Sequence, residues 1–424
     1  MGYLFLGTAT FISTLWWLLA KPNLHIMALV PWLSLSQYLA VIGATLLAFN
    51  FVLAVRSRWV EDRFGGLDKV YKAHHLTGAL ATIFLINHPI MLALNIMPLY
   101  KVALLYFIPN VSQLAYASGI LSLYIMIVLL LLTLYVKLPY PLWLKTHKLM
   151  GVPLLLGALH MVLITSDISR YLPLRLWLLG LMGIALMAYL YKLVLYRFLG
   201  PKRNYRVTDV VTNGPFTMLG MVPQNKSLQF RAGQFAFLSL HNRVIGREAH
   251  PYSFASAQHE PTLYFVVKSL GDYTRKLPEA KVGDKVTLFG PYGRLGDKML
   301  MSDRRCIWIC GGVGITPFLS LMHSVRHDQQ VDWFYSVNKR PEAVFETAIN
   351  QAISGQPNLR YHLHVAQENG FLTAAKVMQQ TGQVERDTLV MLCGPLPMME
   401  AFKKQFMALG CKSRQIIYED FSLL

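Results

Sequence analysis

Four histidines in the apolar first half of the chain have the residue type and spacing to hold metal centres. His74 and His88 lie fourteen residues apart in "YKAHHLTGALATIFLINHP", residues 71–89, and His147 and His160 lie thirteen apart in "THKLMGVPLLLGALH". An imidazole in a membrane-length apolar segment is costly unless it is paired, hydrated or bound to something. Each of these histidines is therefore a hypothesis about function.

Helical geometry sets which of the histidines can act together. A helix turns about 100° and rises about 1.5 Å per residue, so fourteen residues return to within about 40° of one face, roughly 21 Å further along. His74 and His88 can thus face one partner helix. His75 lies thirteen residues from His88, about 140° away by the same arithmetic, so His74 is the preferred ligand.

The second pair needs an irregularity to face the first. His147 and His160 are also thirteen apart, but Gly151 and Pro153 lie between them, and proline kinks or locally unwinds a helix. With such a break, two helices present two stacked histidine pairs. Two haems, each with both axial positions filled by histidine, are the natural occupants, and such centres pass electrons without binding substrate.

Two other interpretations of these histidines stay open. One is that they are hydrogen-bonded inside a bundle or lie at helix ends. The other is metal transport, which is disfavoured because the acidic residues of this half lie outside the expected spans. These acidic residues are Glu61, Asp62, Asp68 and Asp167.

The elements that carry the histidines are predicted membrane spans. The chain has 424 residues, of which 54% are hydrophobic and 15% charged, too apolar for an ordinary soluble protein. Runs of roughly 17–25 apolar residues predict transmembrane helices. They fall near residues 3–20, 34–55, 73–95, 114–136, 146–165 and 174–196.

Charge distribution predicts the orientation of the spans. The loops after the second, fourth and sixth spans are rich in lysine and arginine, and the alternate loops are poorer, so both termini are expected in the cytoplasm. The net charge of +18 is scattered and accompanies no RNA- or DNA-reading motif, which argues against a nucleic-acid partner. The four cysteines lie in the last third without framework spacing, as in a reducing compartment.

The second half predicts two soluble domains. Hydropathy drops near residue 200, and short alternating strands such as "FAFLSL" and "TLYFVV" follow. "RRCIWICGGVGITPFLSLM" then switches to a buried strand, a glycine turn and a helix, the start of an α/β unit. The predicted domains are a six-span bundle over 1–199, an antiparallel β-barrel over 200–300 and an α/β nucleotide-binding domain over 301–424.

Two stretches of the barrel region have the residues of a flavin site. In "HPYSFASA", residues 250–257, Tyr252 can lie against an isoalloxazine while Ser253 hydrogen-bonds its polar edge. In "SLGDYTRKL", residues 269–277, a glycine turn and Thr274 open an expected helix whose amides suit a pyrophosphate. Ordinary barrel packing is the competing interpretation of the tyrosine.

The last domain has a glycine-rich turn and a second loop suited to a nucleotide. "ICGGVGITPF", residues 309–318, permits a tight turn and close approach to phosphate. "MLCGPLPMM", residues 391–399, follows another buried strand, where open α/β sheets bind ligands, although Cys393 could be a small packing residue. In "YSVNKRPE" the candidates for a 2′-phosphate are Ser336, Lys339 and Arg340, which favour NADPH over NADH.

The order of these motifs carries a resemblance. HPYS, GDYT, GPYG (290–293), GGVGITP and CGPLPM look like the flavin and pyridine-nucleotide modules of the ferredoxin-NADP reductase superfamily. Preceded by the histidine-bearing spans, residues 35–424 resemble the NADPH oxidase and ferric reductase family of transmembrane haem proteins. The resemblance implies two b-type haems in the membrane, FAD on the barrel and NAD(P)H on the last domain.

Carried over by position, the resemblance implies a full set of site residues. His74 and His147 would hold the inner haem, and His88 and His160 the outer haem. The FAD-binding residues would be His250, Pro251, Tyr252, Ser253, Lys268, Gly271, Asp272, Tyr273, Thr274 and, over the flavin, Phe421. The NAD(P)H-binding residues would be Gly311, Gly312, Gly314, Thr316, Pro317, Ser336, Lys339, Arg340, Cys393, Gly394, Pro395 and Met398.

The expected activity is electron transfer across a membrane, from NADPH through FAD and two haems to an acceptor on the far side. Cofactors do the chemistry, so no side chain is assigned a catalytic role. Oxygen, giving superoxide, is favoured because the outer loops show no acidic or histidine-rich cluster; a ferric chelate or a membrane quinone are the alternatives. No obligatory protein partner is expected. From a different class, a transporter with a regulatory nucleotide domain remains to be tested.

Overall fold

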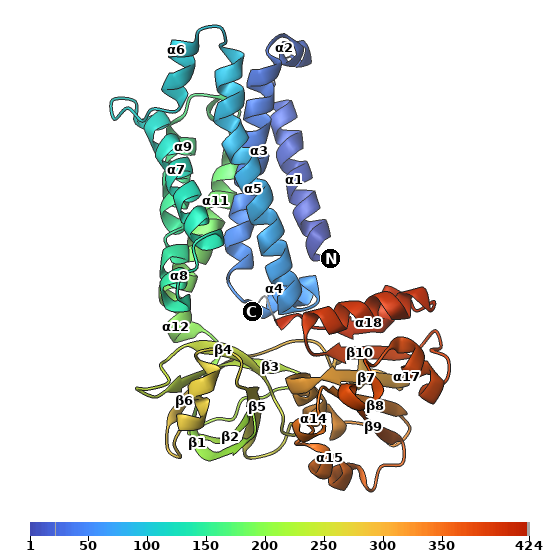
Figure 1. Cartoon of the computed structure of the whole chain (residues 1–424). Helices are drawn as coiled ribbons and strands as arrows, with labels where there is room; N and C mark the ends of the chain where they lie inside the picture. The colour runs from blue at the N-terminus through green and yellow to red at the C-terminus, as the bar shows by residue number, and fades with distance from the viewer. Residues whose placement is uncertain (22, 422–424) are drawn as a thin grey trace. The chain divides into compact units, whose positions relative to one another are not determined.

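The computed structural model describes residues 1–21 and 23–421 of the chain. It divides into two compact units, Met1–Gly200 and Pro201–Leu424. In the described part of the first unit, six helical segments are long and apolar enough to cross a membrane (Figure 1). They are α1 (Gly2–Leu19), α3 (Pro31–Leu53), α5 (Leu67–Asn95), α7 (Leu114–Leu134), α8 with α9 (Tyr140–Lys148 and Gly151–Leu163), and α11 (Leu172–Leu190) with the π-helical η2 (Tyr191–Leu195).

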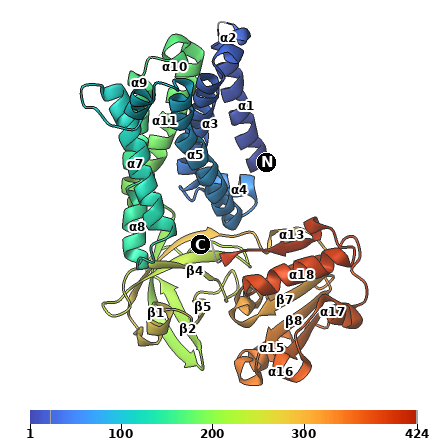
Figure 2. The ribbon, with the colours of Figure 1, turned by 45° about the horizontal axis from the view of Figure 1, so that its top comes forward.

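These segments confirm the six predicted spans, with ends that differ from the predicted ones by up to six residues. The fifth span is two helices, because Leu149 and Met150 form a turn between α8 and α9. α3 and α5 run side by side in both views (Figures 1 and 2). The connecting helices are α2 (Leu24–Leu29), α4 (Arg58–Phe64), α6 (Tyr100–Ala103), η1 (Leu104–Tyr106), α10 (Asp167–Arg170) and α12 (Tyr196–Leu199).

An antiparallel six-stranded sheet begins the second unit. Its order is β4-β3-β6-β1-β2-β5, and Phe254, just past β4, bridges Phe265 of β5, so the two edges of the sheet meet as in a barrel. One sequence prediction is wrong in detail: β3 does not alternate, because six of its seven residues are buried. The strands are β1 (Lys202–Asn213), β2 (Phe216–Pro223), β3 (Phe235–His241), β4 (Ala249–Ser253), β5 (Leu263–Lys268) and β6 (Lys285–Tyr292), with η3 (Thr274–Glu279) before β6.

A parallel five-stranded sheet of order β11-β10-β7-β8-β9 completes this unit. The chain reverses direction of winding between β7 and β10, which is where ligands bind in doubly wound sheets. Its strands are β7 (Cys306–Gly311), β8 (Val331–Val337), β9 (Leu359–Val365), β10 (Leu389–Cys393) and β11 (Ile416–Tyr418). Its helices are α13 (Asp297–Leu300), η4 (Gly312–Ile315), α14 (Thr316–Met322), η5 (Arg340–Glu342), α15 (Glu346–Ile353), α16 (Ala366–Asn369), α17 (Ala374–Thr381), α18 (Leu396–Ala408) and η6 (Ser413–Gln415).

Side chains of β7 alternate between two cores, which puts helices on both faces of the sheet. Trp308 and Cys310 pack with Phe318 of α14, while Ile307 and Ile309 pack in the separate core that contains residues of α17 and α18. Figure 2 shows α17 and α18 together on one side of the strands and α15 on the other. Burial on both faces explains why β7 and β10 are continuous apolar runs.

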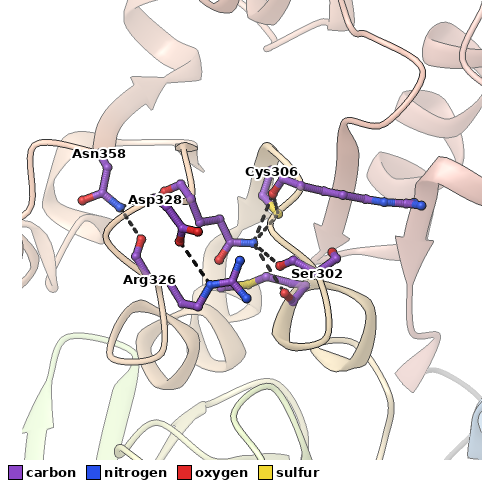
Figure 3. A network of polar contacts seen from close by, with 8 residues as sticks. Ser302, Cys306, Arg326, Asp328 and Asn358 are labelled. Atoms are coloured by element: carbon purple, nitrogen blue, oxygen red, sulfur yellow. Dashed lines mark hydrogen bonds and ion pairs between the residues drawn. The ribbon is translucent and has the colours of Figure 1, made fainter.

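A polar network ties the loops at the amino ends of the parallel strands. The buried Gln329 amide donates to the carbonyl groups of Ser302 (3.3 Å) and Arg304 (3.1 Å), and Asn358 donates to the carbonyls of Arg326 (2.7 Å) and Gln329 (2.8 Å) (Figure 3). These bonds satisfy backbone groups that would otherwise be buried without partners. These hydrogen bonds hold the loops at the amino ends of the strands together. The glycine-rich loops lie at the opposite edge, after the carboxyl ends of the strands.

Candidate functional site

The structure brings His74 and His147 together. His74, in α5, and His147, in α8, have ring centroids 6.2 Å apart and ring planes inclined by 67°. Imidazole–metal bonds are about 2 Å long, so two such bonds, with the distance from each ring centre to its nitrogen, account for this separation. His75 is exposed to solvent on the surface of the unit. The pair can hold one metal ion between its two rings.

His88 and His160 form the second pair, further along the same two membrane spans. His88 is in α5, which continues through Pro89, and His160 is in α9, close enough for the two rings to interact electrostatically. The irregularity that the thirteen-residue spacing required is present, but at Leu149 and Met150; the predicted Gly151 and Pro153 lie just after it, in the first turn of α9. Gly151 begins α9 where a Cβ atom would lie 2.0 Å from the ring of Tyr189, so a larger residue does not fit there.

Hydrogen bonds on the inner nitrogen, Nδ1, fix the orientation of three of the four rings. The partners of Nδ1 are the carbonyl of Asn50 for His74 (3.0 Å), Ser36 for His88 (2.7 Å to Oγ) and the carbonyl of Ala115 for His160 (2.6 Å). A carbonyl only accepts, so it requires Nδ1 to carry the proton. The outer nitrogen, Nε2, is then left with its lone pair, as in a metal ligand whose other nitrogen donates to the protein.

The Asn50 contact has a simple origin in the end of a helix. Asn50 lies in the last turn of α3, where carbonyl groups have no intrahelical donor. The Asn50 side chain also accepts a hydrogen bond from Thr77 (2.9 Å). These acceptors were not predicted from the sequence, because a backbone carbonyl has no residue-type signal.

His147 is held differently. Its Nδ1 is buried and has no hydrogen-bond partner among the described residues, and its ring stacks on Trp143 at 5.3 Å with planes 5° apart. Trp143 lies four residues earlier on the same helical face, a spacing at which side chains meet. That spacing was the available signal for Trp143, and the sequence reasoning missed it.

These residues fit two bis-histidine haems. In the part of the chain that the structure describes, no hydrogen bond engages Nε2 of His74, His88, His147 or His160, and no group of three or more histidine, cysteine or acidic residues could hold a bare metal ion. A pair of imidazoles is an incomplete ligand set for a bare ion but a complete axial set for a haem.

The predicted flavin residues gather around β4. Ser253 is paired with Phe235 of β3, and Phe421 packs on Phe235 with ring centroids 5.1 Å apart, so Phe421 lies near the end of the "HPYS" strand. His250 lies against Tyr273 at 4.2 Å. The Tyr252 hydroxyl is buried without a hydrogen-bond partner among the described residues, and burial raises its pKa above the usual range. Burial also raises the pKa of Tyr273 to about 12.

The turn at Gly271 and Asp272 is closed by its own side chains. Thr274 begins η3, and its Oγ accepts from the amides of Leu270 and Gly271 at 2.9 Å each. Asp272 accepts from the amide of Tyr273 at 2.9 Å. The amides expected to face a pyrophosphate are therefore held within the turn, which fixes its shape.

The two nucleotide loops meet at the carboxyl ends of β7 and β10. A Cβ atom on Gly314 would lie 2.3 Å from the Cys393 carbonyl oxygen, and one on Gly311 would lie 2.6 Å from the Met398 sulfur. Gly312 has φ +54°, and α14 begins with Thr316 and Pro317. Gly394 also has a positive φ, +155°, and precedes Pro395 at the cap of α18. Burial raises the pKa of the Cys393 thiol to about 12, so this cysteine is a neutral packing group and not a nucleophile at neutral pH.

Two of the three predicted basic residues of these sites, Lys268 and Arg340, have carboxylate neighbours. The Lys268 ammonium is 3.5 Å from Glu342 and is the group nearest to a Cβ placed on Gly312, at 4.0 Å. Arg340 pairs with Glu368 through two bonds of 3.1 and 3.2 Å. Lys339 is exposed, and Ser336 ends up beside Gly311 across β7 and β8.

The fold and these sites define a membrane-spanning, flavin- and nicotinamide-dependent oxidoreductase. The sequence matches three family models: a ferric reductase like transmembrane component over residues 39–158, an FAD-binding domain over 203–295 and an oxidoreductase NAD-binding domain over 308–404. This domain composition matches that of the NADPH oxidase and ferric reductase family, with a ferredoxin-NADP reductase type module in the second unit.

Individual relatives are similar over part of the chain. The carnitine monooxygenase reductase subunit of Escherichia coli K12 is 28% identical over 182 residues, covering 41% of this chain and 54% of the relative. The toluate 1,2-dioxygenase electron transfer component of Pseudomonas putida is 27% identical over 210 residues, covering 46% and 60%. The chain therefore spans little more than half the length of these curated relatives.

A solved flavohemoglobin from Malassezia yamatoensis, with bound FAD and heme, aligns with a TM-score of 0.50 at 16% identity, covering 93% of this chain and 97% of that chain. At this identity the similarity concerns the fold alone.

Proposed function

We propose that this protein passes electrons from NADPH, through FAD and two b-type haems, across the cell membrane to oxygen, which is reduced to superoxide. The observation that carries the proposal is the His74–His147 pair: two imidazoles with a ligand-like separation and no hydrogen bond on Nε2 among the described contacts. Bound haem supplies a one-electron centre that needs no substrate site of its own.

The residues of the chain then have distinct tasks. His74 and His147 hold the inner haem, and His88 and His160 the outer one. The strand His250–Ser253 and Phe421 hold the flavin, while Gly311–Pro317 and Cys393–Met398 hold the nicotinamide nucleotide. The two nucleotide loops pack so closely that Gly311 and Gly314 leave no room for a side chain, which supports their binding one nucleotide together.

The proposed orientation places both termini in the cytoplasm, where NADPH is available. Arg56, Arg58 and Arg63 follow the second span, and Lys137 and Lys145 follow the fourth, which supports this topology by the positive-inside rule. Electrons then leave on the opposite side of the membrane. The bilayer is the expected environment, and no protein partner is invoked.

A spectrum tests the haem assignment. The purified full-length protein is expected to show a Soret band and reduced-minus-oxidised haem bands, with two haems per chain by pyridine haemochrome. A protein without haem bands would contradict the proposal and favour a transporter with a regulatory nucleotide domain.

Turnover measurements test the acceptor. Oxygen needs only to approach the edge of the outer haem, so NADPH oxidation is expected to reduce cytochrome c in a manner that superoxide dismutase inhibits. Turnover with ferric chelates, insensitive to the dismutase and faster than with oxygen, would instead identify a ferric-chelate reductase of the same family.

A double substitution tests the preference for NADPH. Lys339→Ala with Arg340→Ala should raise KM for NADPH about tenfold and leave NADH kinetics unchanged, because hydrogen bonds to a charged phosphate are lost. Arg326→Ala is the matched control, since Arg326 is exposed in the same domain and pairs with Asp328 at the amino ends of the strands. Equal NADPH kinetics in the double variant would remove these two residues from the nucleotide site.

A further inference from the structure

Ser36, in α3, contacts His88 at two points. Its Oγ lies 2.8 Å from the His88 carbonyl oxygen and 2.7 Å from His88 Nδ1, and the Ser36 carbonyl lies 3.0 Å from the same Nδ1. The Ser36 side chain is fully buried. Water therefore cannot replace it as a partner of the histidine.

The protons in this contact can be assigned without ambiguity. The His88 carbonyl can only accept, so the Ser36 hydroxyl proton is directed to it. The Ser36 Oγ lone pair and the Ser36 carbonyl then both face Nδ1 as acceptors. Nδ1 must be the protonated nitrogen, and Nε2 keeps its lone pair.

The position of this contact in the helix is also informative. His88 precedes Pro89 inside α5, and the residue before a proline is disfavoured in helical conformation. The backbone at His88 is thus a weak point of the helix. By binding both the carbonyl and the ring of His88, Ser36 couples the ring orientation to the backbone at this point.

Ser36 differs from the partners of the other histidines. The described Nδ1 partners of His74 and His160 are backbone carbonyls, and His147 Nδ1 has no partner among the described residues. His88 Nδ1 faces the Ser36 hydroxyl as well as the Ser36 carbonyl, so a substitution can remove one of its two acceptors. Among these contacts, Ser36 supplies the acceptor that belongs to a side chain.

We propose that Ser36 is a positioning residue for the outer haem: it holds His88 in the Nδ1–H tautomer with Nε2 directed to the iron. Donation from Nδ1 to an acceptor also raises the basicity of the ligand. The role toward haem rests on the proposed function, whereas the tautomer of His88 does not and can be measured in protein without haem.

The test uses the full-length chain in detergent with ¹⁵N-labelled histidine, freed of any haem, and assigns the His88 signals by comparison with His88→Gln. We expect wild-type His88 to be the Nδ1–H tautomer. In Ser36→Ala the ratio of Nε2–H to Nδ1–H should rise about fivefold, the effect of losing one ordinary hydrogen bond. Ser36→Thr, which keeps the hydroxyl, should match wild type.

The matched control is Ser34→Ala, because Ser34 is a buried serine of the same helix with no hydrogen bond to a histidine among the described residues. An Nε2–H tautomer in the wild-type protein would overturn the proposal whether or not the variants fold. An unchanged ratio in Ser36→Ala, or an equal change in Ser34→Ala, would overturn it as well.

The haem-loaded protein gives the second readout. Ser36→Ala should release haem from one of the two centres about tenfold faster and shift the potential of that centre, leaving the other unmoved. Equal release from both centres would contradict a role at His88. A colourless wild-type protein would refute the proposed function, while the tautomer measurement would still decide the role of Ser36.

Discussion

In the His88–His160 pair both imidazoles donate a hydrogen bond from Nδ1, whereas in the His74–His147 pair the described contacts include such a bond for His74 and none for His147. His147 is instead held by the face of Trp143. A stacked ring fixes the plane of an imidazole but not which nitrogen carries the proton, while a carbonyl fixes both. Different substitutions should therefore weaken haem binding at each of the two pairs.

The largest effect should come from removing one ligand of either pair. His88→Ala and His74→Ala are each expected to lower the haem content from two per chain to about one, because one axial bond no longer closes the site. Pyridine haemochrome assays on the purified variants measure this. His75→Ala is the matched control beside His74, and it should keep both haems. Loss of haem in the His75 variant equal to that in the His74 variant would reverse the ligand assignment.

A smaller effect, confined to the outer pair, is expected from crowding His160. A Cβ atom on Gly119 would lie 2.7 Å from His160 Nδ1, so Gly119→Ala must displace the ring or the helix, at a cost of about 1–3 kcal/mol. Redox titration should show one haem component shifted or lost. Gly183→Ala is the control, since a Cβ atom there has no neighbour within 4 Å. Two equally perturbed components would mean that the pairs are not independent.

The smallest effect should come from the inner pair through Trp143. Trp143→Leu removes a stacking contact worth about 0.5–1.5 kcal/mol, so haem should be retained but released faster from the inner centre only. Haem transfer to apomyoglobin measures the release rates, and Trp143→Phe, which keeps a stacked ring, should lie close to wild type. An unchanged rate in the leucine variant would show that stacking does not hold His147.

The sequence predicted the membrane spans more accurately than their ends. Apolar run length was enough to identify all six spans, because a membrane-spanning helix must satisfy its own backbone and remain apolar for its whole length. The ends were less accurate: the third span was expected to begin at residue 73 and begins at Leu67, in a segment that includes Asp68, Lys69 and Lys72. A hydropathy criterion excludes charged residues from a span, so it places the start of the helix too late when the helix begins with them.

The spacing of residues in the sequence could not predict the neighbours of the site residues. The acceptors at Asn50 and Ala115 are backbone carbonyls, and their partners follow from where one helix ends and how two helices pack. Lys268 is one of the residues that the resemblance assigns to FAD, and its ammonium lies beside Glu342 and near Gly312 of the nucleotide loop. Three-dimensional proximity between β5 and η4 has no counterpart in sequence order.

The turn at Leu149 and Met150 has a consequence for how such a membrane domain can change. Inserting one residue in an uninterrupted helix would swing every later side chain by about 100°. Here His147 and His160 lie in separate helices, α8 and α9, so after a change in the length of the turn each side chain would still be oriented by its own helix. The turn therefore lets two histidines thirteen residues apart each face a histidine of α5, whereas an unbroken helix would need a spacing of about fourteen.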